Sequence, residues 1–110
     1  MDITMNFVAA GQKPLEGGYV TARETDQQLV VRAQRGDTRA FDLLVLKYQG
    51  RIATLVARFV NDAAEVEDVT QEAFIKAFRA LPKFRGESAF YTWLYRIASN
   101  AAKNYLVARG

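Results

Sequence analysis

Residues 37–59 read DTRAFDLLVLKYQGRIATLVARF, and this stretch decides the fold class of the chain. Asp37 can cap a helix by accepting a backbone N–H from its first turn. Apolar side chains then recur with the i, i+3, i+4, i+7 spacing of one helix face, at Phe41, Leu44, Val45, Tyr48, Ile52, Leu55, Val56 and Phe59. The pattern predicts a long amphipathic helix that tolerates Gly50 in its interior.

A shorter helix is expected before this one. Thr25 and Gln28 have the spacing of a capping box, in which each side chain bonds the other residue's backbone N–H. Gly36 has the position that ends a helix over residues 26–35, because glycine adopts the left-handed conformation at low cost.

A third helix is expected after residue 61. Asp62 and Glu65 again have capping-box spacing, and Pro82 marks the end of the helix or an exit from it. The side chains expected to point inward follow helical spacing: Val66, Val69, Ala73, Phe74, Ala77, Phe78 and Leu81.

A loop over residues 83–87 separates this helix from a fourth, which we expect Ser88 to cap and which runs to about Val107. One face of the fourth helix is apolar, with Phe90, Leu94, Ile97, Ala98 and Ala101. No segment alternates with the period of a strand. The predicted fold is therefore all-α, a compact bundle of three or four helices.

The length of 110 residues suits one domain, and 50% apolar with 25% charged residues is a globular composition. Residues 1–24 contain several glycines and a proline without sustained periodicity, so we expect a flexible leader there. The folded domain is expected over residues 25–110.

Composition also limits the chemistry and the compartment. The chain has no cysteine, which excludes disulfides and thiolate metal sites, and no histidine, the usual proton shuttle at neutral pH. An enzyme is therefore a distant alternative, and we expect neither a cofactor nor a metal. No apolar run has the length of a membrane span, so membrane insertion is not expected and a cytoplasmic location is the default.

The acidic residues of the third helix gather on one stripe, since Glu65, Asp68 and Glu72 are three and four positions apart and Gln71 lies beside them. Such a stripe is often a solvated face favoured by the helix dipole. A metal site is the weakest alternative, because no loop gathers oxygens around a point. Docking onto a basic partner is the functional alternative.

Four rings near the fourth helix cannot all face the core: Phe84, Tyr91, Trp93 and Tyr95. A core position is the ordinary interpretation of any single ring. Exposed rings beside Lys83, Arg85 and Arg96 would suit unpaired bases on a phosphate backbone.

Arg96, Asn100 and Lys103 are spaced i, i+4, i+7 and share one face of the fourth helix. This face is either a solvated exterior or a nucleic-acid surface, on which the amide addresses a base edge and the cations hold phosphates. We interpret the basic residues of the second helix as solvated: Lys47, Arg51 and Arg58.

Five ordered motifs closely resemble the extracytoplasmic-function (ECF) RNA polymerase sigma factors of the sigma-E type, from about Asp26 to Arg109. They are DQQLV at 26–30, RGD at 35–37, AFDLLV at 40–45, DVTQEAFIKA at 68–77 and FRGESAFYTWLYRIA at 84–98. The resemblance implies the region-2 domain of a transcription initiation factor that is not an enzyme.

The resemblance assigns two partners to residues of this chain. RNA polymerase core would bind the acidic element through its β′ clamp helices, at Asp68, Gln71 and Glu72, with Glu65 on the same stripe. The non-template single strand of the promoter −10 element would be captured by the loop and the fourth helix, at Ala80, Lys83, Phe84, Arg85, Tyr91, Trp93, Arg96, Asn100 and Lys103.

Some features depart from the family pattern. Leu94 stands where housekeeping sigma factors usually carry a second tryptophan, which implies weaker promoter melting. Family members continue into a −35-reading domain, so we expect this chain to be part of a longer factor. The main alternative function is a protein-interaction module bound by an anti-sigma factor, or by the clamp alone, without DNA binding of its own.

Overall fold

The computed structural model describes residues 24–109. Within that range the chain forms four α-helices and one turn of 3-10 helix, with no strand, so the predicted all-α fold is confirmed. The elements are α2 (Asp26–Gln34), α3 (Thr38–Val56), α4 (Ala63–Ala80), η1 (Leu81–Lys83) and α5 (Phe90–Arg109). The predicted leader, apart from Glu24, lies outside the described residues.

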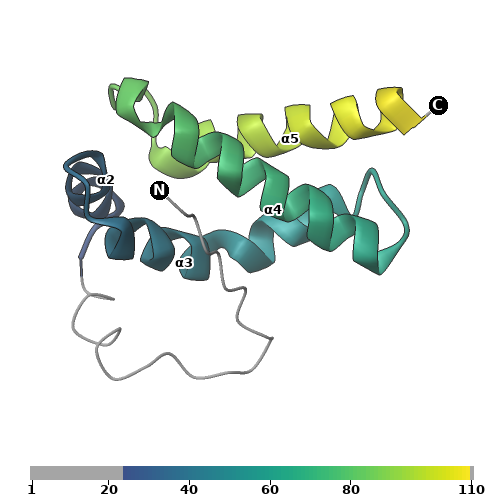
Figure 1. Ribbon diagram of the computed structural model, residues 1–110, viewed down its shortest axis with the longest axis horizontal. Helices are drawn as coiled ribbons and strands as arrows, with labels where there is room; N and C mark the ends of the chain where they lie inside the picture. The colour runs from purple at the N-terminus through teal and green to yellow at the C-terminus, as the bar shows by residue number, and fades with distance from the viewer. Residues whose placement is uncertain (1–23, 110) are drawn as a thin grey trace.

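The helices pack so that α4 contacts both α3 and α5, and α2 packs on α3 (Figure 1). The turn from α4 through η1 into α5 lies at the same end of the molecule as α2. This arrangement brings residues near the start of the domain against a loop that is about half the chain away in sequence.

The junction between α2 and α3 follows from local hydrogen bonds. Thr25 and Gln28 form the predicted capping box, with Gln28 N donating to Thr25 Oγ1 at 3.2 Å and Thr25 N donating to Gln28 Oε1 at 2.9 Å. Gly36 has φ +102°, and the N–H groups of Gly36 and Asp37 return to the last turn of α2. This is a Schellman motif, which turns the chain directly into the next helix.

Asp37 caps α3 as predicted, since one carboxylate oxygen accepts from Arg39 N at 3.1 Å. The other oxygen accepts from Arg32 Nη2 at 2.6 Å, and Arg32 also pairs with Glu24. The Arg32 hydrogen bond lowers the pKa of Asp37 below its ordinary value. One carboxylate therefore starts α3 and ties it to α2.

The long helix ends earlier than the apolar pattern indicates. After Val56 the N–H groups of Arg58 and Phe59 bond carbonyls only three residues back, which tightens the chain into a turn. Phe59 is half-buried beyond the helix end, and Val60, which the pattern did not include, is buried.

Two predicted caps of the later helices need correction. Asp62 caps α4 by accepting from Ala64 N and Glu65 N, but the Glu65 carboxylate pairs with Arg109 across the bundle. The assignment of Ser88 as the cap of α5 is wrong, because the helix begins at Phe90 and the Ser88 hydroxyl donates to Ala89 O at 3.3 Å.

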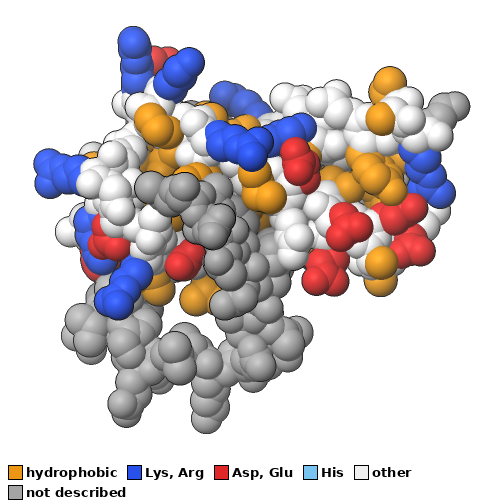
Figure 2. Space-filling model, in the orientation of Figure 1, with side chains coloured by type: hydrophobic (Ala, Val, Ile, Leu, Met, Phe, Trp, Pro, Cys, Tyr) orange, Lys and Arg blue, Asp and Glu red, His pale blue; other side chains and the backbone are white. Residues whose placement is uncertain are grey.

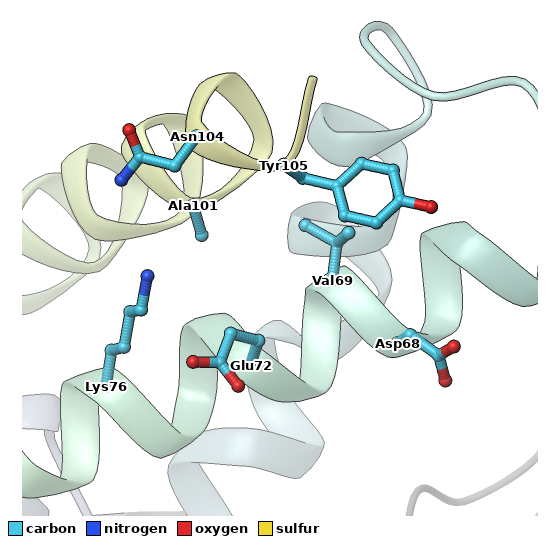
Figure 3. A pocket seen from close by; sticks show the side chains of 7 residues that line it. All are labelled: Asp68, Val69, Glu72, Lys76, Ala101, Asn104 and Tyr105. Carbon is cyan, nitrogen blue, oxygen red and sulfur yellow. The ribbon is translucent and has the colours of Figure 1, made fainter. Parts of the chain in front are cut away.

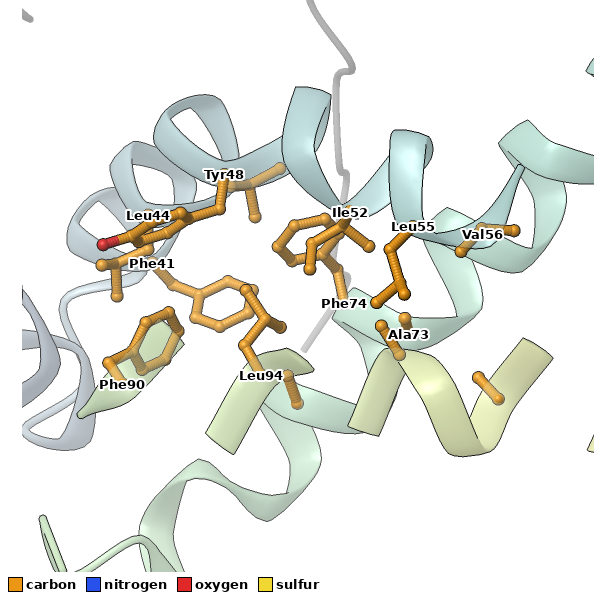
Figure 4. Close-up of a cluster of buried hydrophobic side chains, with 14 of the residues drawn as sticks. Phe41, Leu44, Tyr48, Ile52, Leu55, Val56, Ala73, Phe74, Phe90 and Leu94 are labelled. Atoms are coloured by element: carbon orange, nitrogen blue, oxygen red, sulfur yellow. The ribbon is translucent and has the colours of Figure 1, made fainter. Parts of the chain in front are cut away.

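The core lies mainly between α3, α4 and α5, and Leu29 and Val30 of α2 also belong to it (Figure 4). Among its largest fully buried side chains are Phe41 and Ile52 of α3, Phe74 of α4 and Leu94 of α5. The predicted inward faces are largely confirmed, although Val66, Phe78 and Ile97 are half-buried: these three lie at the edge of their helix faces. The core thus fixes which sides of α4 and α5 remain outside.

Candidate nucleic-acid interface

The loop that follows α4 exposes two cations and holds one ring. Lys83 and Arg85 are exposed, while Phe84 between them is half-buried. The Phe84 ring lies 4.8 Å from the Trp93 ring and 6.2 Å from the Phe90 ring, between ring centroids. Phe84 therefore anchors the loop on α5 and leaves only part of its ring available to a ligand.

The other rings form one connected row from α3 to α5. Tyr48 of α3 stacks on Tyr91 with centroids 5.0 Å apart, and Tyr91 meets Tyr95 edge-on at 6.1 Å. Tyr91 and Trp93 are half-buried, and Tyr95 is 38% exposed. The expectation that the four rings cannot all face the core is confirmed.

Lys47 and Arg51 of α3 are exposed, as interpreted from the sequence, but they also contact the rings of this row. The Arg51 guanidinium lies 5.4 Å from the Tyr91 ring centroid. Lys47 Nζ lies 2.6 Å from the Asp26 carboxylate, which also accepts the Tyr48 hydroxyl. Burial, and next the hydrogen bond to Asp26, raise the pKa of Tyr48. Arg58 is exposed.

The outer face of α5 carries Arg96, Asn100 and Lys103, all exposed as their spacing predicts. Among residues 24–109 the cations Lys83, Arg85, Arg96 and Lys103 take part in no ion pair. Ala80 is half-buried at the last position of α4, directly before η1. The loop and α5 therefore offer unneutralised positive charge beside partly exposed rings, which suits a phosphate backbone with unpaired bases.

The acidic stripe lies on a different part of the surface. Figure 2 shows acidic side chains gathered where α4 begins, and Lys and Arg side chains toward the end that holds α2 and the η1 turn. Asp68 and Glu72 are exposed, and Gln71 is half-buried. Surfaces of opposite charge on one small domain can bind two different partners.

Glu65 has a different position from the rest of the stripe. Its carboxylate accepts from Arg109 Nη1 at 3.0 Å, which joins the start of α4 to the end of α5. Burial, and next the hydrogen bond with Glu65, raise the pKa of Tyr105. Glu65 is thus engaged within the domain, whereas Asp68 and Glu72 form no ion pair with any residue of the described range.

A groove of about 330 Å³ runs between α4 and α5 beside the stripe. Val69, Ala101 and the Tyr105 ring form its apolar floor, and polar side chains of both helices border it (Figure 3). Its full lining is Asp68, Val69, Glu72, Lys76, Ala101, Asn104 and Tyr105. Within the described residues no cluster of acidic side chains is arranged to hold a metal ion, and no helix is long and apolar enough to cross a membrane.

Sequence reasoning missed Gln34, the last residue of α2. Its Nε2 donates to Leu81 O at 3.0 Å and to Phe84 O at 2.8 Å, so it holds the backbone of the η1 loop. No local pattern marks this residue, because its partners are 47 and 50 positions away in the chain.

The described residues form an all-helical bundle with acidic side chains on one part of its surface and a basic, ring-bearing loop on another. The chain belongs to the Sigma-70 region 2 family, whose model matches residues 44–110.

Similar proteins within this family are sigma-H and ECF sigma-E factors. The chain is 74% identical over 88 residues to the RNA polymerase sigma-H factor of Pseudomonas aeruginosa, covering 80% of this chain and 46% of that protein. It is 66% identical over 86 residues to the ECF RNA polymerase sigma-E factor of Escherichia coli strain K12, covering 78% of this chain and 44% of the relative. The chain thus spans a little under half the length of these relatives.

Two solved structures have the same fold. One is the NMR structure of an engineered region 2 of sigmaE in complex with GTAAAA, with a TM-score of 0.76, 59% identity, and coverage of 80% of this chain and 92% of that chain. The other is CnrH in complex with the cytosolic domain of CnrY, with a TM-score of 0.68, 32% identity, and coverage of 74% and 53%.

Proposed function

We propose that this chain is a promoter-specificity domain of a transcription initiation factor. It binds RNA polymerase core through α4, and it captures the non-template strand of the −10 element with the η1 loop and α5. It is not an enzyme, since the polymerase performs the chemistry. The observation that carries the proposal is the set of four cations that form no ion pair within residues 24–109 and lie beside half-buried rings on the loop and α5, on a domain 59% identical to one solved with GTAAAA.

Each group of residues has a defined role in this proposal. Phe84 and Trp93 offer ring faces to a base displaced from the stack, beside Ala80 at the end of α4 and Tyr91 at the start of α5. The cations neutralise phosphates and give affinity without sequence information: Lys83, Arg85, Arg96 and Lys103. Asn100 can address a base edge, because its amide carries both a donor and an acceptor.

The polymerase contact uses the exposed carboxylates of α4. Asp68 and Glu72, with Gln71 between them, meet the β′ clamp helices, while Glu65 supports the surface from within the domain through Arg109. An anti-sigma factor is the expected regulator. The 32%-identical neighbour in complex with the cytosolic domain of CnrY supports a regulatory protein partner for this fold.

Fluorescence anisotropy with labelled GTAAAA and with a scrambled strand of the same composition tests the DNA half. We expect tighter binding to GTAAAA, and affinity that falls with salt for both strands. Binding to a β′ clamp-helix fragment tests the other half. Clamp binding without any salt-dependent binding of single strands would instead support the interaction-module alternative.

A further inference from the structure

Gln34 joins two segments that are far apart in sequence. The same Nε2 atom bonds the carbonyl oxygens of Leu81 and Phe84, which flank the two central residues of the η1 turn. The backbone of this turn is also closed from within, because Phe84 N donates to Leu81 O at 3.0 Å. Gln34 therefore adds a second closure of the same turn, supplied by α2.

Side-chain packing also holds the loop, because Leu81 is fully buried and the Phe84 ring packs on Phe90 and Trp93, whereas the middle of the loop is open. Lys83, Arg85 and Gly86 are exposed, and Gly86 has φ +76°, a conformation that other residues rarely adopt. The Phe84 ring fixes one side of the loop against Trp93, and Gln34 fixes the backbone on the side facing α2. The position of the Phe84 ring thus depends in part on Gln34 of α2, which is 50 positions away in the sequence.

We propose that Gln34 is a positioning residue for sequence-selective strand capture, which rests on the function proposed above. It sets the backbone around Lys83 and Phe84 so that one ring face and one cation reach a base and its phosphate together. A side chain that only added stability to the fold would not change which single-strand sequence the domain prefers.

The chemistry of the amide is essential to this role. The Gln34 NH₂ group donates two hydrogens, and both acceptors are carbonyl oxygens. A glutamate at this position has nearly the same shape but only acceptors when ionised, so it repels both carbonyls. The bond to Phe84 O is exposed to solvent, where water can replace a lost donor. Loss of the amide should therefore loosen the loop more than it destabilises the domain.

Gln34→Glu and Gln34→Ala test the proposal in the whole 110-residue chain. Gln27→Glu and Gln27→Ala are matched controls, since Gln27 is exposed on the same helix. Trp93 is the single tryptophan of the chain and touches the Phe84 ring, so acrylamide quenching of its fluorescence reports on the loop without DNA. Anisotropy with GTAAAA, with strands carrying each base replaced in turn, and with a scrambled strand measures selectivity.

We expect acrylamide to quench the Trp93 fluorescence of the Gln34 variants more strongly than that of the wild type. We also expect their preference for GTAAAA over its single-base variants to fall about three- to tenfold, the effect of losing the hydrogen bond to Phe84 O. Affinity for the scrambled strand should stay within about twofold, since phosphate contacts are independent of base. The Gln27 controls should match wild type in every measurement.

Two results would overturn the inference while leaving the proposed function intact. One is unchanged strand preference and unchanged Trp93 quenching in both Gln34 variants. The other is an equal loss on all strands together with a lower melting temperature, which would make Gln34 a purely structural support. If wild type itself shows no preference for GTAAAA, the proposed function fails, and the quenching comparison still decides whether Gln34 holds the loop.

Discussion

At the scale of single residues, the proposed DNA surface divides between rings that are partly in the core and cations that are entirely outside it. Phe84 and Trp93 each contact neighbouring rings, so a substitution there affects both folding and binding. Arg96 and Lys103 are exposed and make no ion pair within the described part of the chain, so their substitution affects binding alone.

Phe84→Ala should weaken binding of GTAAAA by about 1–3 kcal/mol through loss of base stacking. It should also lower the melting temperature, because the ring packs on Trp93 and Phe90. Phe84→Leu is the control, since it keeps apolar volume but has no ring face. Calorimetry and anisotropy on both variants separate the effects, and a Leu variant that binds as tightly as wild type would exclude stacking.

Asn100 and Lys103 share an exposed face of α5 but differ in chemistry. Lys103→Ala should weaken matched and scrambled strands equally and reduce the salt dependence, because a phosphate contact releases counterions regardless of base. Asn100→Ala should weaken mainly the matched strand. Titrations of both variants at low and high salt measure this. Equal losses on both strands for Asn100→Ala would assign it no role in base recognition.

At the scale of elements, α4 presents its acidic stripe because its other side is committed to the core through residues such as Val69, Ala73 and Phe74. The stripe is close to the groove between α4 and α5, so a partner on α4 also approaches α5. The element thus links the two proposed surfaces.

Asp68→Lys combined with Glu72→Lys should abolish binding to a β′ clamp-helix fragment, because reversed charges repel a basic partner. Helix content by circular dichroism should not change, since exposed carboxylates contribute little to folding. Glu67→Lys is the control, as an exposed acid one position away on α4. Clamp affinity that survives the double reversal but falls with Glu67→Lys would move the contact to another face of the helix.

The stability that the α2–α3 junction gives the domain should depend on pH, because Asp37 can be protonated. Its pKa is lower in the folded protein because of Arg32, so its contribution to stability is complete above the ordinary aspartate value of about 3.9. That contribution disappears as the pH falls below this value. Asp37→Asn keeps a capping side chain but removes the charge.

Thermal melts of wild type and Asp37→Asn across acidic and neutral pH measure this dependence. The variant should melt lower than wild type at neutral pH, and the two melting temperatures should converge as the pH falls below about 3.9. A constant difference at every pH would assign the effect to the cap and not to the ion pair.

At the scale of the whole molecule, one core supports both proposed surfaces. Phe74 of α4 is fully buried among side chains of α3 and α5, on the helix that carries the acidic stripe and near α5, which carries residues of the proposed DNA surface (Figure 4). Neither surface can keep its geometry if this packing is lost.

Phe74→Ala should destabilise the domain by about 3–5 kcal/mol, because it removes a large buried ring and leaves a cavity. This is a large part of the stability of a small domain. Urea denaturation measures the change, and clamp and strand binding should weaken together. If the destabilised Phe74→Ala variant kept one binding activity in full, the surface for that activity would not need the common core.

The sequence by itself determined the elements of this protein. Thr25 with Gln28, Gly36, Asp37 and Asp62 all act where they were predicted, because each bonds backbone groups within five positions in the chain. The apolar spacing of α3, α4 and α5 also identified most of the core, since helical periodicity fixes which side chains share a face, although it did not include Leu29, Val30, Ala40, Val60 and Ala102.

Tertiary structure alone decided how these elements form a site. Four of its contacts join residues that are distant in the chain or on different elements. They are the bonds of Gln34 to the η1 loop, the packing of Phe84 on Trp93, the pairing of Glu65 with Arg109 and the placement of Arg51 over Tyr91. The end of α3 and the start of α5 belong here as well, because packing determines where a marginal helix end stops. Periodicity and capping patterns describe bonds within one helix, whereas these contacts depend on the relative placement of helices, which only the packed core fixes.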